Sequence, residues 1–431
     1  MAQNSDIADV RRRGFSKLMS VKDALSSFFE QCKLPRLAAE IVPVHDALGR
    51  VLAEDVVCQR DVPPFNRSAV DGFAVRSEDT FGCSPTNPVV LQVIGTSYVA
   101  NMPEITLGRH QAMKIMTGAP MPHGSDAVVM IEYTELTRED KVEVYRTVTP
   151  LENVSLQGED VKKGEVVLRA GYKVEPPDIA ILAALGIRNV KVKQKPKIGV
   201  ISTGNELADL SEEISEWRIF DSNRPALIAM VKLAGGDPVD LGIAADNEYE
   251  IAMKLKTGLM NCDVVLVSGG SSVGEHDLLP SVVNSLGRPG LLVHGVAMRP
   301  GKPVALAAIE NKPVIIFPGL PVAAMIAFEV FAQPIIERML GLSASLPLRV
   351  VKARCLRRLP SSLGNRTFAR VIVRKMDEGF VFEPLSTSGS GIISTLVKAN
   401  GIVTIPENKE GVEEGELVEV RIIRPIEELT T

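Results

Sequence analysis

The chain has 431 residues, of which 45% are hydrophobic and 23% charged, and its net charge is −5. This composition is typical of a globular protein, and at about 100–200 residues per domain the length predicts two to four domains. The negative net charge argues against a nucleic-acid binder. Five scattered cysteines without CxxC spacing indicate reduced thiols and a cytoplasmic protein. We expect no membrane span, because no apolar run reaches the ~18 residues required, and no signal peptide.

The first half of the chain predicts a helix followed by β-rich structure. Apolar residues at helical spacing predict a helix over 21–32. Residues 38–57 suggest a short helix and a strand. Short β-rich runs separated by Gly and Pro turns predict a small barrel or sandwich over 62–157. Residues 158–187 then suggest a strand, a turn and a helix capped by Gly186, before a basic linker at 191–197.

From residue 198 the pattern changes to alternating strands and helices. Strands are expected at 198–203, 238–244, 264–268, 291–298, 303–308 and 313–318, and helices at 223–235, 247–259, 281–287 and 321–341. Pro334 should kink or interrupt the last helix. This alternation predicts a parallel, doubly wound α/β sheet whose ligands lie beyond the carboxyl ends of its strands. Residues 346–431 return to short strands and predict a further β-domain.

The most informative segment is 264–280, VVLVSGGSSVGEHDLLP, where a buried strand ends in a Gly/Ser loop and a carboxylate. Amides and hydroxyls in such a loop can hold an anion, and the carboxylate can hold a divalent cation against it. Taken alone, the loop is more often a simple turn. The candidate residues are Gly269, Gly270, Ser271, Ser272, Gly274 and Asp277.

Two more segments place polar residues near the same sheet edge. IGVISTGNEL (198–207) suggests strand, turn and helix, with Ser202, Thr203 and Gly204 facing an anion and Glu206 at the helix start. A glycine turn with a capping residue is the simpler interpretation. Asp221 and Ser222 precede the helix at 223–235; an N-cap is the default role, and metal or hydroxyl binding by Asp221 is the alternative.

Basic and proline-rich turns follow. RPGKP (299–303) places Arg299 and Lys302 on a rigid turn, suited either to an oxyanion or to solvent. FPGLPVAA (317–324) places Pro318, Gly319 and Pro321 at the start of a helix, where geometry alone or anion binding explains the pattern.

Taken together, the motifs resemble the molybdopterin molybdenumtransferase family, of the MoeA and gephyrin E-domain type. The matching segments, in the family's order, are PPFNRSAVDGFAVR, IMTGAPMPHGSDAVV, GED, STGNEL, FDSN, SGGSSVGEHD, RPGKP, FPGLPVAA and GSGIISTLVKAN. Each motif alone is weak, but nine in order cover nearly the whole chain. The sequence departs from the family pattern at Asn66, Asn205, Ser271, Arg299 and Leu320.

The resemblance implies a four-domain fold. An elongated domain of residues 20–61 and 159–192 would carry an inserted β-rich domain, 62–158. The α/β molybdopterin-binding domain would follow at 193–342 and a C-terminal β-barrel at 343–431. Relatives form homodimers, with a cleft between the α/β domain of one subunit and the inserted domain of the other, which would bring Asp71 and Thr117 to Asp277.

The resemblance also implies a reaction. Molybdate would be inserted into adenylylated molybdopterin, the product of an upstream molybdopterin adenylyltransferase, with release of AMP and formation of molybdenum cofactor. Asp71, Thr117, Glu206, Asp221 and Asp277 would be catalytic. Glu206, Asp221 and Asp277 would bind Mg²⁺, and Arg299, Lys302, Arg370 and Ser390 would bind molybdate. A molybdopterin adenylyltransferase and a gephyrin-like scaffold without enzymatic activity are the competing hypotheses.

Overall fold

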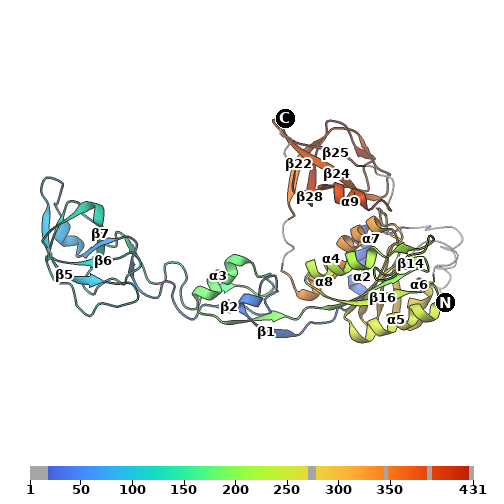
Figure 1. Cartoon of the computed structure of the whole chain (residues 1–431), viewed down its shortest axis with the longest axis horizontal. Coiled ribbons are helices and arrows are strands. Elements are labelled where there is room, and N and C mark those ends of the chain that lie inside the picture. Colours follow the sequence, from blue (N-terminus) through green and yellow to red (C-terminus); the bar gives the residue numbers. More distant parts are fainter. Residues whose placement is uncertain (1–17, 139, 270–277, 344–347, 386–390, 427–431) are drawn as a thin grey trace. The chain divides into compact units, whose positions relative to one another are not determined.

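The computed structural model describes residues 18–138, 140–269, 278–343, 348–385 and 391–426 (Figure 1). The described residues form two compact units. Unit 1 takes them from Met1–Glu40, Gly49–Val51 and Val192–Thr431, and unit 2 from Ile41–Leu48 and Leu52–Lys191. The division passes through β1 (Ala39–Pro43) and β12 (Asn189–Lys193). The four-domain division remains a prediction.

Unit 1 contains a six-stranded sheet of order β16-β13-β17-β21-β20-β18. The first four strands run parallel, as predicted, whereas β20 runs antiparallel to both of its neighbours, β21 and β18. The strands are β13 (Lys197–Thr203), β16 (Asp237–Ala244), β17 (Val264–Ser268), β18 (Pro289–His294), β20 (Ala305–Ile309) and β21 (Lys312–Phe317).

The antiparallel strands follow from the absence of a helix between β20 and β21. Only Glu310 and Asn311 separate these strands, and both have positive φ values, 50° and 65°. Two such residues make a tight hairpin turn, whereas a parallel connection needs a crossover of a dozen or more residues.

Helices cover both faces of this sheet, because alternate residues of each strand point to opposite sides. Leu266 of β17 packs in the core with α2 (Val21–Gln31), α4 (Asn223–Leu233) and the segment 321–340, while Val265 and Val267 pack with α5 (Glu248–Asn261) and α6 (Leu279–Leu286). The predicted interruption near Pro334 is confirmed. A π-helical segment, η4 (Phe328–Ala332), separates α7 (Pro321–Ala327) from α8 (Gln333–Leu340).

The C-terminal part of unit 1 is a closed barrel, because β26 pairs back onto β24. Its five strands are β22 (Val350–Cys355), β24 (Arg366–Met376), β25 (Gly379–Pro384), β26 (Gly401–Ile405) and β28 (Leu417–Ile422). Val371, Val373 and Phe382 lie in its core. A short strand, β19 (Met298–Arg299), pairs with β24, so the RPGKP turn lies against the barrel.

Unit 2 contains a second six-stranded sheet, of order β7-β4-β6-β5-β9-β8. Its strands are β4 (Gly72–Val75), β5 (Val89–Ser97), β6 (Gln111–Ile115), β7 (Ala127–Met130), β8 (Thr134–Arg138) and β9 (Lys141–Val144). The predicted helix near 176 is α3 (Pro176–Ala184), with Gly186 just beyond its end at φ +74°. Two strand pairs complete this unit: β2 (Val56–Val57) with β11 (Val166–Leu168), and β3 (Arg67–Ser68) with β10 (Val154–Ser155).

Within the described part of the chain, every helix is too short or too polar to cross a membrane.

Candidate functional site

Three adjacent parallel strands end together at the carboxyl edge of the unit 1 sheet. Ser202 of β13 is in register with Ser268 of β17, which is in register with Phe317 of β21. The turns that follow are tightly packed, since the Gly269 N–H donates to the Phe317 carbonyl at 3.1 Å. Gly269 has φ +117°, and a Cβ there would lie 2.4 Å from the Thr203 carbonyl oxygen. Glycine is therefore required at this position.

Buried polar atoms without a partner gather at this edge. Among the residues that the structure describes, Ser202 Oγ, Thr203 Oγ1 and Asn223 Oδ1 are buried and make no hydrogen bond. Buried polar groups are almost always paired, so such atoms call for an explanation. A ligand at the edge of the sheet would supply the missing partners.

Glu206 lies in the turn after β13, next to this edge. The predicted helix at this point is wrong: the chain continues as a short strand, β14 (Leu207–Ala208), because β14 pairs with β15 (Ile219–Phe220). The Glu206 side chain is exposed and folds over Gly204, where a Cβ would lie 2.6 Å from one carboxylate oxygen. Gly204 thus leaves room for the carboxylate.

Asp221 is 2% exposed and caps helix α4, as its simpler interpretation predicted. Its Oδ1 accepts the N–H groups of Asn223 and Arg224, both at 3.1 Å, and its Oδ2 accepts from Arg224 Nε at 3.1 Å. The neighbouring Ser222 is exposed and its side chain makes no capping hydrogen bond.

Arg224 is a buried cation that the sequence reasoning missed. Besides Asp221, its guanidinium binds Asp240 at 2.6 Å and also binds Asp209. The pKa of Asp209 is lowered to about 2, first by hydrogen bonds from the Ser211 hydroxyl and amide and then by Arg224. The sequence did offer one indication of this ion pair, because Arg224 follows the capping residue Asp221 by three positions. The other two partners of Arg224 come from other segments of the chain and could not be predicted locally.

The proposed magnesium ligands fit a metal only in part. Asp221 is a poor ligand here, because its oxygens already accept three hydrogen bonds, whereas the exposed carboxylate of Glu206 remains available. Within the described ranges, no three His, Cys, Asp or Glu residues form a group that could hold a metal. Gly270, Ser271, Ser272, Gly274 and Asp277 lie outside the described residues, as does Ser390.

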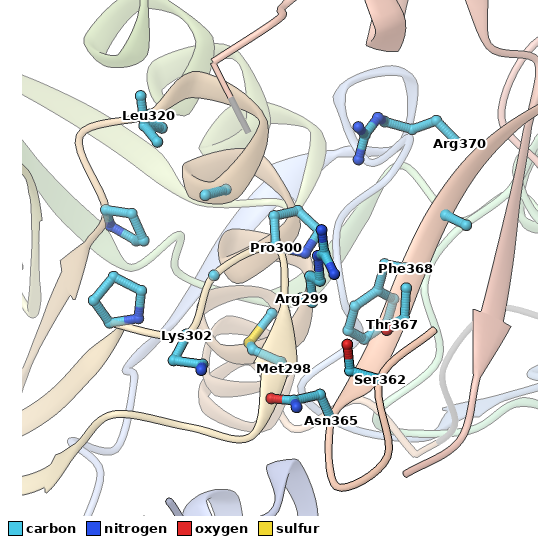
Figure 2. Close-up of a pocket in the computed structure, with 15 residues that line it drawn as sticks. Met298, Arg299, Pro300, Lys302, Leu320, Ser362, Asn365, Thr367, Phe368 and Arg370 are labelled. Atoms are coloured by element: carbon cyan, nitrogen blue, oxygen red, sulfur yellow. The ribbon is translucent and has the colours of Figure 1, made fainter. Parts of the chain in front are cut away.

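A pocket of about 390 Å³ lies between the α/β sheet and the barrel (Figure 2). It is lined by Arg299 and Lys302 from one side and by Arg370 of β24 from the other, and none of the lining residues that the structure describes is acidic. Pro318 and Leu320 of the turn before α7 also line it, next to Gly319 and Pro321. Cations that line one pocket suit a small oxyanion.

Arg370 is nearly buried, with 4% of its surface exposed. Its Nε donates to Thr395 Oγ1 at 3.0 Å, and burial lowers its pKa below the usual arginine value. Ser362, Asn365 and Thr367 also line the pocket and were missed. They belong to the barrel and carry no local motif.

In unit 2, Asp71 and Thr117 are direct partners. Asp71 Oδ1 accepts the Thr117 N–H at 2.6 Å and the Thr117 hydroxyl at 2.9 Å. These two bonds, the amide first, lower the pKa of Asp71, and both residues are exposed. Gly72 follows in β4, where a Cβ would lie 1.9 Å from the Val129 carbonyl oxygen, so this motif also requires glycine.

Three family models match the chain in order. They are the MoeA N-terminal region (domain I and II) at residues 19–186, a probable molybdopterin binding domain at 199–338 and the MoeA C-terminal region (domain IV) at 352–423. The chain belongs to the MoeA family. The family resemblance seen in the sequence motifs is thereby confirmed.

Relatives of this MoeA-family chain match it almost end to end. A protein of Methanocaldococcus jannaschii named for molybdopterin biosynthesis is 41% identical over 94% of this chain and 96% of its own length. The molybdopterin molybdenumtransferase of Bacillus subtilis is 35% identical over 89% of this chain and 90% of its own. The crystal structure of a molybdopterin biosynthesis MoeA protein from Pyrococcus horikoshii has a TM-score of 0.81 and 36% identity, covering 94% of this chain and all of that one.

Proposed function

We propose that this MoeA-family chain is a transferase that inserts molybdate into adenylylated molybdopterin, forming molybdenum cofactor and releasing AMP. The names of its relatives support the substrate class. The observation that carries the proposal is the pocket that Arg299, Lys302 and Arg370 line together. Such a site stabilises an oxyanion through charge and donated hydrogen bonds.

In this proposal the two halves of the site have different tasks. The cationic pocket, with Ser390, holds molybdate. The sheet edge holds the phosphorylated pterin through Ser202, Thr203, Gly204, Ser222, Gly269, Gly270, Ser271, Ser272, Gly274, Pro318, Gly319 and Pro321. Because both halves flank the Pro318–Leu320 turn, they would present two substrates to each other, and positioning supplies much of the rate.

The proposal includes Mg²⁺, but with two protein ligands in place of the three that the sequence predicted. Glu206 and Asp277 would hold it, while Asp221 orders the start of α4 through its bonds to backbone amides and Arg224. When bound, Mg²⁺ would neutralise charge on the phosphate groups. The prediction that Asp221 is a metal ligand does not fit its surroundings.

We further propose a cytoplasmic homodimer in which Asp71 and Thr117 complete the site of the other subunit. The hydrogen bonds that Thr117 donates to Asp71 lower its pKa and so favour its ionised form, which, at an exposed position, suits a residue that orients an attacking group or a metal. A molybdopterin adenylyltransferase would supply the substrate upstream.

The deciding experiment measures AMP. The purified chain should release AMP from adenylylated molybdopterin when molybdate and Mg²⁺ are both present, and release should fall when EDTA removes the metal. The absence of AMP, under conditions where a known family member works, refutes the proposal. ATP consumption with free molybdopterin would instead favour an adenylyltransferase. An Asp277→Ala chain that keeps all biological function would favour a scaffold.

A further inference from the structure

Asn223 connects the two turns that form the sheet-edge half of the site. It is 7% exposed, and its Nδ2 donates to Ser268 Oγ and to the Gly319 carbonyl, each at 2.7 Å. Ser268 ends β17, directly before the Gly269 turn, and Gly319 lies in the turn between β21 and α7. One side chain at the start of α4 therefore spans two other elements.

The orientation of this amide is fixed by its surroundings. The Gly319 carbonyl can only accept a hydrogen bond, so the atom facing it must be the nitrogen of the Asn223 amide. Oδ1 then points away from both partners, and it makes no hydrogen bond with any residue in the described part of the chain. Both N–H donors of the Asn223 amide therefore bind protein atoms, and its acceptor oxygen, Oδ1, has no hydrogen-bond partner among the described residues.

The buried polar atoms that make no hydrogen bond lie close to the contact between the Gly269 and Gly319 turns. Ser202 is in register with Ser268, and the Thr203 hydroxyl is 2.6 Å from where a Gly269 Cβ would be. Gly319 is close to Gly269 as well, since a Cβ on Gly319 would be 3.6 Å from the Gly269 Cα. The distance between these two turns thus determines the space around the side chains of Ser202, Thr203 and Asn223. We call this space at the sheet edge the cradle.

We propose that Asn223 is a positioning residue that holds the Gly269 turn against the Gly319 turn and so determines affinity for the phosphorylated pterin substrate. This inference rests on the proposed function, because it assigns the cradle to that substrate. Asn223 acts through the two turns, and its side chain makes no hydrogen bond with any of the three cations assigned to molybdate, so molybdate binding should change less than binding of the pterin substrate.

Asn223→Asp tests the inference with almost no change in shape, and because its added charge would itself repel a phosphorylated substrate, hydrogen exchange decides whether a raised KM comes from the turns. A carboxylate keeps the acceptor but cannot donate to the Gly319 carbonyl, so the turns should separate. The KM for adenylylated molybdopterin should rise about tenfold, while kcat and the KM for molybdate change less than about twofold; a tenfold change corresponds to about 1.4 kcal/mol. As pH falls, a protonated Asp regains one donor, so the KM defect relative to the parent should shrink.

Asn247→Asp is the matched control, because Asn247 is the N-cap of α5 and Asp caps a helix equally well. It should leave all three constants unchanged. The inference is overturned if Asn223→Asp keeps the parental KM, if only kcat falls, or if Asn247→Asp has the same effect.

A second measurement separates this inference from the proposed function. Hydrogen exchange of the peptides containing Gly269 and Gly319 should accelerate in Asn223→Asp and stay parental in Asn247→Asp. If the parent chain releases no AMP, the proposed function fails. Hydrogen exchange then still tests whether Asn223 holds the two turns together. Exchange rates that are the same in Asn223→Asp as in the parent would overturn the positioning role of Asn223.

Discussion

Arg224 is buried among three carboxylates from separate segments, Asp209, Asp221 and Asp240. Asp221 is itself buried and accepts hydrogen bonds from Arg224 and from the amides at the start of α4. Removing one member of a buried pair leaves an uncompensated charge.

Arg224→Met should therefore lower the free energy of unfolding by about 3 kcal/mol, as measured by urea denaturation. Arg358→Met is the control, because Arg358 pairs with Glu413 where both side chains are exposed, so its loss should cost little. Equal stability losses in the two variants would contradict a special role for Arg224.

The Thr117–Asp71 contact predicts a pH dependence. The hydrogen bonds from Thr117 lower the folded-state pKa of Asp71, so they stabilise the protein above the unfolded pKa, and this stability is lost as pH falls through the folded value. Thr117→Val should lower the melting temperature near pH 7, and the deficit should shrink as pH falls below the ordinary aspartate pKa. Thr134→Val, at an exposed hydroxyl bonded to the Ile131 carbonyl, should show no such trend.

At the scale of elements, the β20–β21 hairpin depends on two residues with positive φ. Glu310 has φ 50°, a conformation that glycine adopts without strain and other residues adopt at a cost of roughly 1 kcal/mol. Glu310→Gly should therefore raise the free energy of unfolding by about 0.5–1 kcal/mol in thermal or urea denaturation. Glu310→Ala keeps the strain and should give no gain; a matching gain would disprove the strain argument.

The cationic pocket also depends on how two elements pack, because it is formed jointly by the turn after β19 and by strand β24. Lys302→Gln removes one positive charge from the pocket and should raise the KM for molybdate at least about tenfold, with a small effect on the KM for adenylylated molybdopterin. Lys256→Gln, on the exposed side of α5, is the control and should leave both values unchanged. A larger effect on the pterin substrate would place molybdate elsewhere.

At the scale of the whole molecule, the shared site of the proposed homodimer allows complementation. At a molybdate concentration far below the raised KM, Asp71→Ala and Lys302→Gln chains would each have little activity alone, but a mixed dimer would contain one intact site. Random re-association of equal amounts should recover about a quarter of the parental AMP release, because half the dimers are mixed and each has one working site of two. A mixture of Lys302→Gln with Arg299→Gln should recover nothing; recovery there, or none in the first mixture, would contradict a shared site.

The sequence by itself determined the regular elements and the family. Buried runs such as 264–268 and the glycines after them predict strands and turns, because burial patterns and positive φ leave local signatures. Tertiary structure decided the extended chain at Leu207, the ion pairs of Arg224 with Asp209 and Asp240, and the position of Lys302 and Arg370 around one pocket. Each of these depends on partners far away in the chain, which packing selects and local sequence does not encode.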